Sequence, residues 1–599
     1  MRHFAHRLAL AIVFAAALGF NDEARLIHAA DESKADHPLY ILVARSLDRA
    51  LDCATDLVQS GGVAVPQDKI AALLTIRNLV FSEFRNPDQL RKCFDSTRPV
   101  GAMVFYRPID KPRKLDTGDA EETEAGILEL FGLLKPSFNR MVYFFPIKDF
   151  PLFLAECKLQ PVPGKQQCFR KPGGQEVFLR QIHDYVIMGD AELIERCPDP
   201  QSVAQSLLGT NDLVVSLQKK GLPDDVRISL VNGVQAAFEA SMERQDDVED
   251  RDHNVNLAIG ELERRLLNLV LLHVDEFNLG LRIDRGKKLI VADLALVAEP
   301  NGRMAKFAAE LTPKQSVFAS LWNPDGDSSL WISLAIPDRH GKIISTLFSE
   351  YADALTEGEE EGEIFKKGIP EVVKMVNAGH FEFIMTEQGD FNTGSSMFAF
   401  KHPSGRDFPK TFEEILRLAD SEVPSEKPYE FGAGFVKEWP AHRMPGRFLA
   451  TKMLTDGNDT LPEGETWVVA SPHALLIAAN FDADNQQMPT LLHSAVELAA
   501  QNGKPTGKGG ENALFRLSYH TRDWKESGIP EFLMPQIDPD EEQREVMAKF
   551  FQEKPERIQI EIRSFERGFR MTMQFEEAFR AVAGLYISNQ LTLVKKTEP

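Results

Sequence analysis

Apolar and polar positions alternate in short runs along the chain, and these runs return in one order. An apolar strand pattern after Asp36, a polar break and a helical pattern are followed, from Asp327 onward, by the same succession. Alternation over four to eight residues is typical of a β-strand, and apolar residues three and four apart are typical of a helix. Because helices mix with strand pairs close enough for hairpins, the pattern predicts an α+β fold with mainly antiparallel sheets.

The spacing of matching positions indicates a tandem duplication. Tyr185 and Trp467 are 282 positions apart, and Gly286 and Gly568 have the same separation. Each of these glycines follows an arginine at the bend of a strand pair, where glycine tolerates the positive φ of a tight turn. We therefore expect two homologous α+β domains, each a mainly antiparallel sheet packed with helices. The two expected domains span residues 35–312 and 313–595.

The tripeptide Asp-Phe-Pro occurs in both copies, at Asp149 and Asp407, each time ahead of an apolar helical pattern. An Asp side chain at this position accepts hydrogen bonds from the first unpaired N–H groups of a helix and favours the positive end of its dipole. Proline is well tolerated in the first turn. We therefore predict that the motif begins a helix. The alternative is that one of the two carboxylates binds a ligand or acts in catalysis.

The N-terminus predicts export. Arg2 and Arg7 precede an apolar run at residues 8–20, which suits the hydrophobic region of a signal peptide but falls short of the ~20 residues that cross a bilayer. Small residues allow cleavage after position 19 or after position 29, so the signal peptide lies within residues 1–29. No later run of 18 apolar residues occurs. We therefore expect a periplasmic or extracellular protein with no stable transmembrane segment once the signal is removed.

The net charge of the chain limits the classes of partner that we expect. The sequence has 68 Lys and Arg residues against 90 Asp and Glu residues, a formal net charge of −22. A surface this acidic repels phosphate backbones and anionic lipid. We therefore expect no nucleic-acid partner, and an unknown protein or a ligand of the cell envelope instead.

Cysteines occur only in the first third of the chain. Cys157 and Cys168 bracket a Pro-Val-Pro-Gly turn, so a disulfide across a hairpin is one expectation in an oxidising compartment. An odd number of cysteines leaves at least one thiol unpaired in the monomer. The five are Cys53, Cys93, Cys157, Cys168 and Cys197.

Catalytic and metal-binding motifs with the right spacing are missing from the sequence. There is no His-Glu-x-x-His for zinc and no Gly-x-Ser-x-Gly nucleophile elbow. Residues 503–510 only resemble a phosphate loop, and residues 323–329 and 480–485 fit turns or solvated loops better than calcium sites. His380 and His473 lack partners at metal-ligand spacing, so we expect structural roles for them. No catalytic, metal or cofactor-binding residue is predicted.

The order of strand, helix, strand, Asp-Phe-Pro helix start, apolar strand pair and Arg-Gly hairpin, repeated after a signal peptide, resembles large exported bacterial proteins of uncharacterised families with a tandemly duplicated α+β domain. The resemblance implies an exported location and a fold, but no activity. Two functions remain open. One is a non-enzymatic binding or scaffold protein. The other is a hydrolase whose site forms in a groove between the two copies from residues distant in sequence.

Overall fold

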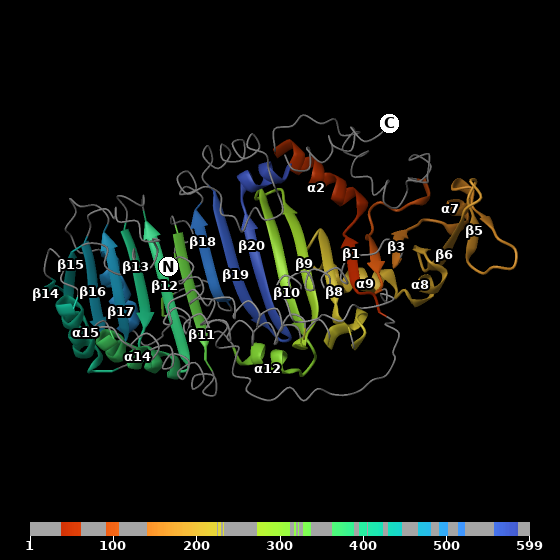
Figure 1. Cartoon of the computed structure of the whole chain (residues 1–599). Coiled ribbons are helices and arrows are strands. Elements are labelled where there is room, and N and C mark those ends of the chain that lie inside the picture. The colour runs from red at the N-terminus through yellow and green to blue at the C-terminus, as the bar shows by residue number, and fades with distance from the viewer. Residues whose placement is uncertain are drawn as a thin grey trace, which may run out of the picture.

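The computed structural model describes seventeen parts of the chain. These are residues 37–60, 92–106, 140–224, 226–228, 232, 272–311, 317–318, 321–322, 328–336, 362–388, 395–403, 405–422, 429–445, 465–480, 490–500, 513–520 and 556–584. Their twenty strands form one antiparallel sheet (Figure 1). The α+β prediction holds in this coarser form, because helices pack on a large antiparallel sheet and most of the secondary structure is sheet. The predicted signal peptide lies outside the described residues.

The first ten strands lie within residues 35–312, here called the N-terminal half. Their pairings give the order β4-β5-β6-β7-β3-β2-β1-β8-β9-β10 across the sheet. The strands are β1 (Tyr40–Ala44), β2 (Val100–Val104), β3 (Met141–Pro146), β4 (Gln160–Pro161), β5 (Cys168–Arg170), β6 (Glu176–Ile182), β7 (Tyr185–Gly189), β8 (Leu213–Gln218), β9 (Val274–Asp284) and β10 (Leu289–Ala298).

The second ten strands lie within residues 313–595, the C-terminal half. Their order is β14-β15-β16-β17-β13-β12-β11-β18-β19-β20, which matches that of the first ten strand for strand. The strands are β11 (Ser328–Ala335), β12 (His380–Gln388), β13 (Ser395–Lys401), β14 (Glu430–Val436), β15 (Trp439–Pro445), β16 (Glu465–Ser471), β17 (Ala474–Asn480), β18 (Ala513–His520), β19 (Arg557–Phe565) and β20 (Gly568–Phe575).

The two halves meet along one pair of strands, which we call the seam. β10 pairs antiparallel with β20, from Ile290 opposite Phe575 to Val297 opposite Gly568. The last strand of one half is therefore hydrogen-bonded to the last strand of the other. β4 and β14 lie at the two far ends of the sheet, so the strand order reads the same outward from the seam in both directions (Figure 1).

Helices cover both faces of the sheet in each half. Since successive strand side chains point to opposite faces, the N-terminal half buries Phe153 of α7 on one face and Leu208 of α9 on the other. In the C-terminal half α15 and α16 pack on separate cores. α7 and α15 both follow the third strand of their half. The helices are α2 (Leu47–Ser60), α7 (Phe150–Glu156), α8 (Ala191–Arg196), α9 (Pro200–Leu208), α12 (Arg303–Glu310), α14 (Gly362–Asn377), α15 (Phe408–Glu422) and α16 (Thr490–Ala500), with a 3-10 turn at Lys219–Gly221.

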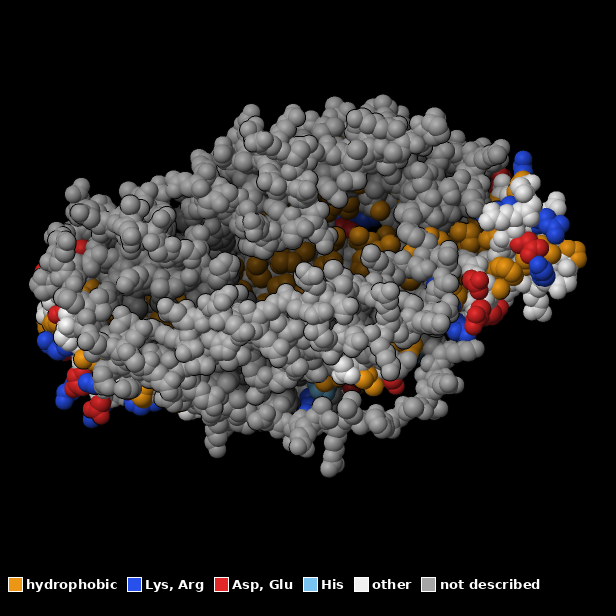
Figure 2. Space-filling view, in the orientation of Figure 1, with side chains coloured by type: hydrophobic (Ala, Val, Ile, Leu, Met, Phe, Trp, Pro, Cys, Tyr) orange, Lys and Arg blue, Asp and Glu red, His pale blue; other side chains and the backbone are white. Residues whose placement is uncertain are grey.

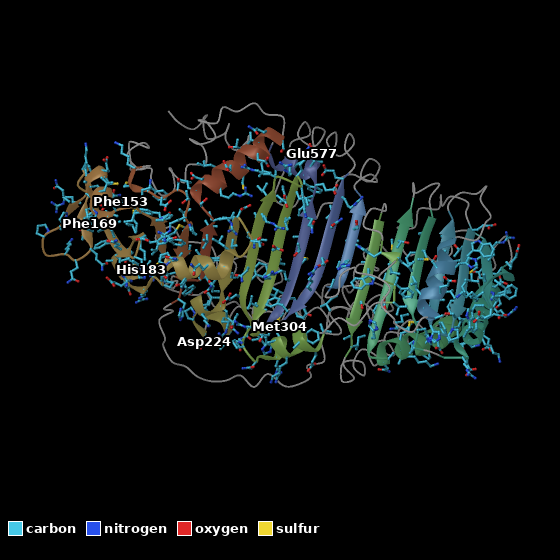
Figure 3. All side chains as sticks on the ribbon, turned by 180° about the vertical axis from the view of Figure 1, so that it is seen from behind. Phe153, Phe169, His183, Asp224, Met304 and Glu577 are labelled. Carbon is cyan, nitrogen blue, oxygen red and sulfur yellow. The ribbon has the colours of Figure 1, made fainter. Side chains whose placement is uncertain are left out.

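The central strands carry an apolar face. Strand pairing puts Leu42, Phe277 and Leu281 on one side of β1 and β9, where each is 37–43% exposed. Figure 2 shows hydrophobic side chains gathered over these central strands. Met304 of α12 and Glu577, at the start of a helix over residues 577–584, lie toward opposite ends of the same strands (Figure 3). Two helices thus border this face.

The prediction that Asp-Phe-Pro begins a helix is confirmed in both halves. α7 begins at Phe150, and the Asp149 carboxylate accepts a hydrogen bond of 2.6 Å from the N–H of Leu152. α15 begins at Phe408, immediately after Asp407. The two Asp residues therefore occupy the same position relative to a helix.

Neither matched pair occupies equivalent positions, so the predicted duplication register is wrong at both. Tyr185 begins β7, the seventh strand of its half, whereas Trp467 lies in β16, the sixth strand of the other half. Gly286 and Gly568 also differ. Gly286 lies in a four-residue connection between β9 and β10, in which Lys288 has the positive φ of 55°. Gly568 is the first residue of β20, after a two-residue connection, and has a φ of 156°. Similar Arg-Gly sequences thus sit in turns of different length.

The hairpin disulfide expected between Cys157 and Cys168 is not present, since all five cysteines carry thiols. The turn itself forms, because β4 and β5 pair across it. The Cys168 thiol instead lies 3.5 Å from a carboxylate oxygen of Glu176.

Candidate ligand-binding site

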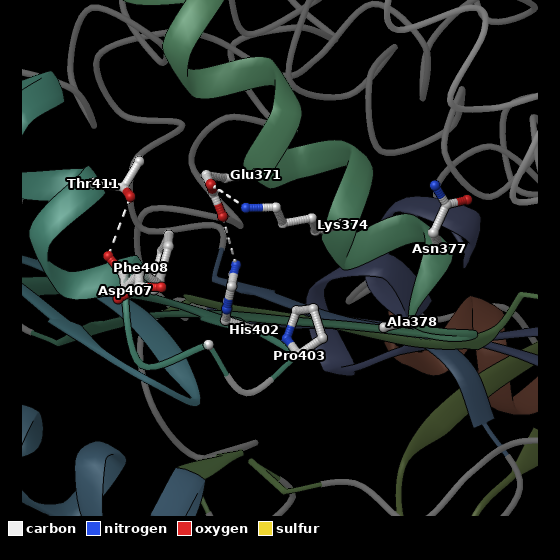
Figure 4. Close-up of a pocket in the computed structure, with 10 residues that line it drawn as sticks. Glu371, Lys374, Asn377, Ala378, His402, Pro403, Asp407, Phe408 and Thr411 are labelled. Atoms are coloured by element: carbon white, nitrogen blue, oxygen red, sulfur yellow. Dashed lines mark hydrogen bonds and ion pairs between the residues drawn. The ribbon is translucent and has the colours of Figure 1, made fainter.

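A pocket of about 470 Å³ opens beside the end of β13, between α14 and the start of α15 (Figure 4). A cavity of this size falls within the usual range of small-molecule sites, roughly 300–1,000 Å³. α14 supplies one wall, and the β13–α15 connection supplies the other. The lining residues are Glu371, Lys374, Asn377, Ala378, His402, Pro403, Gly405, Asp407, Phe408 and Thr411.

His402 and Glu371 form a buried pair in this pocket. His402 Nε2 lies 3.2 Å from a carboxylate oxygen of Glu371, and the two side chains are 1% and 8% exposed. The imidazole stacks on Phe408, with ring centroids 3.7 Å apart and planes 7° apart. Burial lowers the pKa of His402, although the Glu371 carboxylate opposes this shift. The ring is therefore neutral near pH 7, and its Nε2–H donates to Glu371, because a carboxylate only accepts.

Lys374 engages the other oxygen of the same carboxylate. It lies one helical turn after Glu371, and its Nζ is 2.6 Å from Oε1. Its side chain is 59% exposed, so this ion pair closes the solvent side of the buried dyad. Each carboxylate oxygen of Glu371 therefore already has a protein partner, Lys374 or His402. Neither oxygen is left with a ligand as its sole partner.

Asp407 differs from these groups and from its counterpart Asp149. Its backbone carbonyl accepts hydrogen bonds from the Thr411 N–H at 2.9 Å and the Thr411 hydroxyl at 3.1 Å. Within the part of the chain that the structure describes, no group donates a hydrogen bond to its carboxylate, which is exposed. Because the side chain of Asp407 does not cap α15, its negative charge remains at the pocket wall. The pocket can therefore attract a cation.

A second cluster has the composition of a catalytic triad but the wrong arrangement. Ser333 Oγ lies 3.0 Å from His380 Nε2, and Lys401 Nζ lies 2.9 Å from His380 Nδ1. Because the ammonium group only donates, Nδ1 must accept, and the ring proton resides on Nε2. Such a tautomer cannot take a proton from Ser333, whereas a triad places its acid on Nδ1.

Glu382 completes this cluster as a structural group. Its carboxylate is fully buried and accepts hydrogen bonds from the N–H of Val317 at 3.0 Å and of Phe318 at 2.8 Å. It therefore fixes the segment at residues 317–318 on the sheet. The structural role expected for His380 fits these contacts.

The structure brings together only some of the residues that the sequence singled out. Asp407 lines the pocket, and the carbonyl of His473 accepts a hydrogen bond of 2.8 Å from the N–H of His402. Asp149 lies in the other half. No sequence motif spans Glu371 and His402, which are 31 positions apart, so their pairing could not be predicted.

Among the residues that the structure places, no group of three or more His, Cys, Asp or Glu side chains could hold a metal ion. In the same part of the chain no helix is long and apolar enough to cross a membrane. Comparison of the chain with protein-family models, curated proteins and solved structures gave no significant match.

Proposed function

We propose that this protein is an exported, non-enzymatic binding protein, and that the pocket between α14 and α15 binds a small organic cation such as an alkylammonium or guanidinium group. The observation that carries the proposal is the exposed Asp407 carboxylate, to which no described group donates. A carboxylate with open acceptor positions forms charge-assisted hydrogen bonds with such a cation.

The rest of the pocket supports a binding role. Lys374 is paired with Glu371, so its charge is compensated and repels a bound cation less than a lone lysine would. The net charge of −22 raises the local concentration of cations around the whole chain. The stacked and buried ring of His402 gives the pocket a rigid floor, and a preformed site binds with a smaller entropy loss.

Binding is favoured over hydrolysis by the state of the two buried histidines. The Nε2–H of His402 is directed to Glu371, and the Nδ1 of His380 accepts from Lys401. His402 Nδ1 has no hydrogen-bond partner among the described residues, but it is buried. Both ring nitrogens of His380 are hydrogen-bonded, so neither ring presents a basic nitrogen to a serine or to a water in this arrangement. The alternative of a hydrolase would require such a base next to a nucleophile.

We also infer that the two halves, residues 35–312 and 313–595, arose by duplication of one ten-stranded unit. Identical strand order in both halves supports this inference. The ligand site does not repeat with the fold. The position that corresponds to Asp407 is Asp149, whose carboxylate is occupied by the N–H of Leu152.

The test is a pair of matched variants, Asp407→Asn and Asp149→Asn. Asn begins helices about as well as Asp, so both variants should fold. Binding of n-butylamine, putrescine and agmatine would be measured by calorimetry, with n-butanol as the uncharged control. We expect Asp407→Asn to weaken amine binding at least tenfold with little change in melting temperature, and Asp149→Asn to leave it unchanged. Equal binding by both variants, or binding of n-butanol as tight as that of the amines, would refute the proposal.

Export has its own measurement. Mass spectrometry of the protein isolated from its native cells should show a new N-terminus between Phe20 and Asp31. An intact Met1 on protein from the soluble cytoplasmic fraction would contradict export without affecting the ligand site.

A further inference from the structure

The apolar face of the central strands continues across the seam. Six neighbouring strands, three from each half, follow one another in the order β8-β9-β10-β20-β19-β18. Their registers align one apolar residue from each strand, and all six side chains are only half-buried. Both halves of the chain therefore build this face. The aligned residues are Val215, Leu279, Leu294, Met571, Ile562 and Phe515.

A second apolar row lies two residues further along each strand, and therefore on the same face. Leu281 in this row is 37% exposed. Figure 2 shows hydrophobic side chains along a hollow over these strands. A contiguous exposed apolar patch marks an interaction site, whereas single exposed apolar residues do not. The second row consists of Leu213, Leu281, Ala292, Met573, Ile560 and Leu517.

Two helices border the two rows on this face. Phe307 of α12 contacts Phe569 of β20, with ring centroids 5.8 Å apart. Phe579, in the helix over residues 577–584, contacts Phe575 of β20 at 4.9 Å. Since Phe569 and Phe575 are six residues apart on one strand, the two contacts are separated by about 20 Å. We call the area between the two helices the apolar groove.

The opposite face of the same strands is polar, and its side chains pair with one another. The Thr572 hydroxyl donates to the Asp293 carboxylate at 2.6 Å across the seam. The Arg516 guanidinium donates to the Glu561 carboxylate at 3.1 Å. The six strands therefore form an amphipathic sheet, whose apolar side chains lie on the face of the groove.

The chemistry of the groove favours a hydrocarbon chain over a protein surface. Each of the six strands is paired on both edges, so its backbone hydrogen-bonding groups are used within the sheet. No side chain of the two rows is charged or donates a hydrogen bond. A protein partner makes about one hydrogen bond per 100–200 Å² of interface, and a second copy of this chain would add another net charge of −22. An alkyl chain needs no hydrogen bond and brings no charge.

The length of the groove also suits such a chain. Six strands with a spacing of about 4.8 Å extend over about 24 Å. An acyl chain in one leaflet spans about 15 Å, which is half of a hydrocarbon core of ~30 Å. One alkyl chain can therefore lie across the seam between the two helices.

We propose that the apolar groove binds the alkyl chain of a lipid whose headgroup carries no net charge. The chain lies across β9, β10 and β20, over Met571 and Met573, whose flexible side chains fit apolar ligands of different shape. The net charge of −22 disfavours an anionic headgroup. This groove is separate from the pocket between α14 and α15, so the inference does not rest on amine binding there.

The experiment is displacement of the uncharged fluorescent probe N-phenyl-1-naphthylamine from the full chain by monooctanoin, monodecanoin and monolaurin. Each buried methylene strengthens binding about fourfold, so each step in this series should increase affinity about fivefold or more. Laurate has the same chain as monolaurin but a negative charge, and should bind more weakly. Equal affinity along the series, no displacement, or laurate binding as tight as that of monolaurin would overturn the proposal.

Leu281→Gln and Leu152→Gln are matched variants. The two leucines are 37% and 39% exposed, so both variants should fold, but Leu152 lies in α7, away from the groove. Leu281→Gln should weaken monolaurin binding about fivefold or more, whereas Leu152→Gln should leave it unchanged. Equal monolaurin affinity of the two variants would overturn the proposal.

Photolabelling locates the ligand in the unmodified chain, and therefore decides the matter even where a variant fails to fold. A diazirine analogue of monolaurin should label peptides from β9, β10 or β20. Labels found only outside the six strands would overturn the proposal. A concentration-dependent dimer that excludes the fluorescent probe would also overturn it, because a second copy would then occupy the groove.

Discussion

Replacing Gly568 by alanine should weaken the seam between the two halves. Gly568 begins β20 and pairs with Val297 of β10. A Cβ atom built at this position would lie 1.9 Å from the carbonyl oxygen of Leu296 and 3.0 Å from its carbonyl carbon. Contacts of this kind do not occur between real atoms, and the obstacle is backbone. One of the two strands must therefore move.

The magnitude follows from what can relax. Overpacking that side chains can absorb costs about 1–3 kcal/mol. Here the close atoms belong to the backbone of β10, so movement disturbs strand pairing as well, and we expect a loss at the upper end, about 3 kcal/mol or more. Every 1.4 kcal/mol is a factor of ten in an equilibrium constant, so the unfolding equilibrium should change roughly a hundredfold.

The matched control is Gly286→Ala. Its added Cβ would meet nothing closer than a carboxylate oxygen of Asp284 at 3.5 Å, an ordinary contact. We expect a change within about 1 kcal/mol, because alanine also restricts the unfolded chain. Urea unfolding followed by circular dichroism would give the midpoints of both variants and of the unmodified chain. Equal midpoints for the two variants would refute the argument from the Leu296 carbonyl.

Three further perturbations test other parts of the structure. Asp149→Ala removes the hydrogen bond to the first turn of α7 and should cost about 0.5–2 kcal/mol in urea unfolding; no loss would mean that water replaces the cap fully. Glu382→Ala leaves two buried N–H groups without an acceptor, each worth about 1–3 kcal/mol, and should lower the melting temperature more than Glu382→Gln does. Burial raises the pKa of Glu556 to about 7 in the folded protein, so the folded state holds this proton more tightly than the unfolded chain does and is stabilised when Glu556 is protonated. This contribution is fully present below about pH 4.5 and is lost as the pH rises through about 7. Glu556→Gln should therefore remove this pH dependence, and a constant difference from the unmodified chain between pH 4.5 and 8 would contradict it.

Local signals predicted local structure well. Asp149 and Asp407 precede helices because the residues that begin a helix are adjacent to it in sequence. No such local signal predicts that β10 pairs with β20. The paired residues are about 270 positions apart, and any strand with an open edge could have paired with β10 instead. Gly286 and Gly568 show the limit most clearly. Their Arg-Gly dipeptides match, but the lengths of the two connections differ, and the length sets the backbone conformation at each glycine.

The sequence singles out Asp407 of the candidate site, but not the pair of Glu371 and His402. Asp407 was noticed for its motif, but whether its carboxylate caps the helix depends on atomic geometry that no residue pattern encodes. The Glu371 and His402 pair joins a helix to the end of a strand, and such pairs depend on tertiary packing. The turn between Cys157 and Cys168 predicts a hairpin disulfide, whereas α7 places Cys157 against a core cluster that lies beneath the helix.

The seam has a consequence for synthesis. β10 is complete when Ala298 has been made, but the strand that covers its outer edge begins about 270 residues later. At roughly 5–20 residues per second, the N-terminal half waits on the order of 15–50 seconds with an open strand edge, which is a template for pairing with other chains. A nascent chain of this protein therefore needs a holding chaperone, or delayed folding, for the whole interval before β20 emerges.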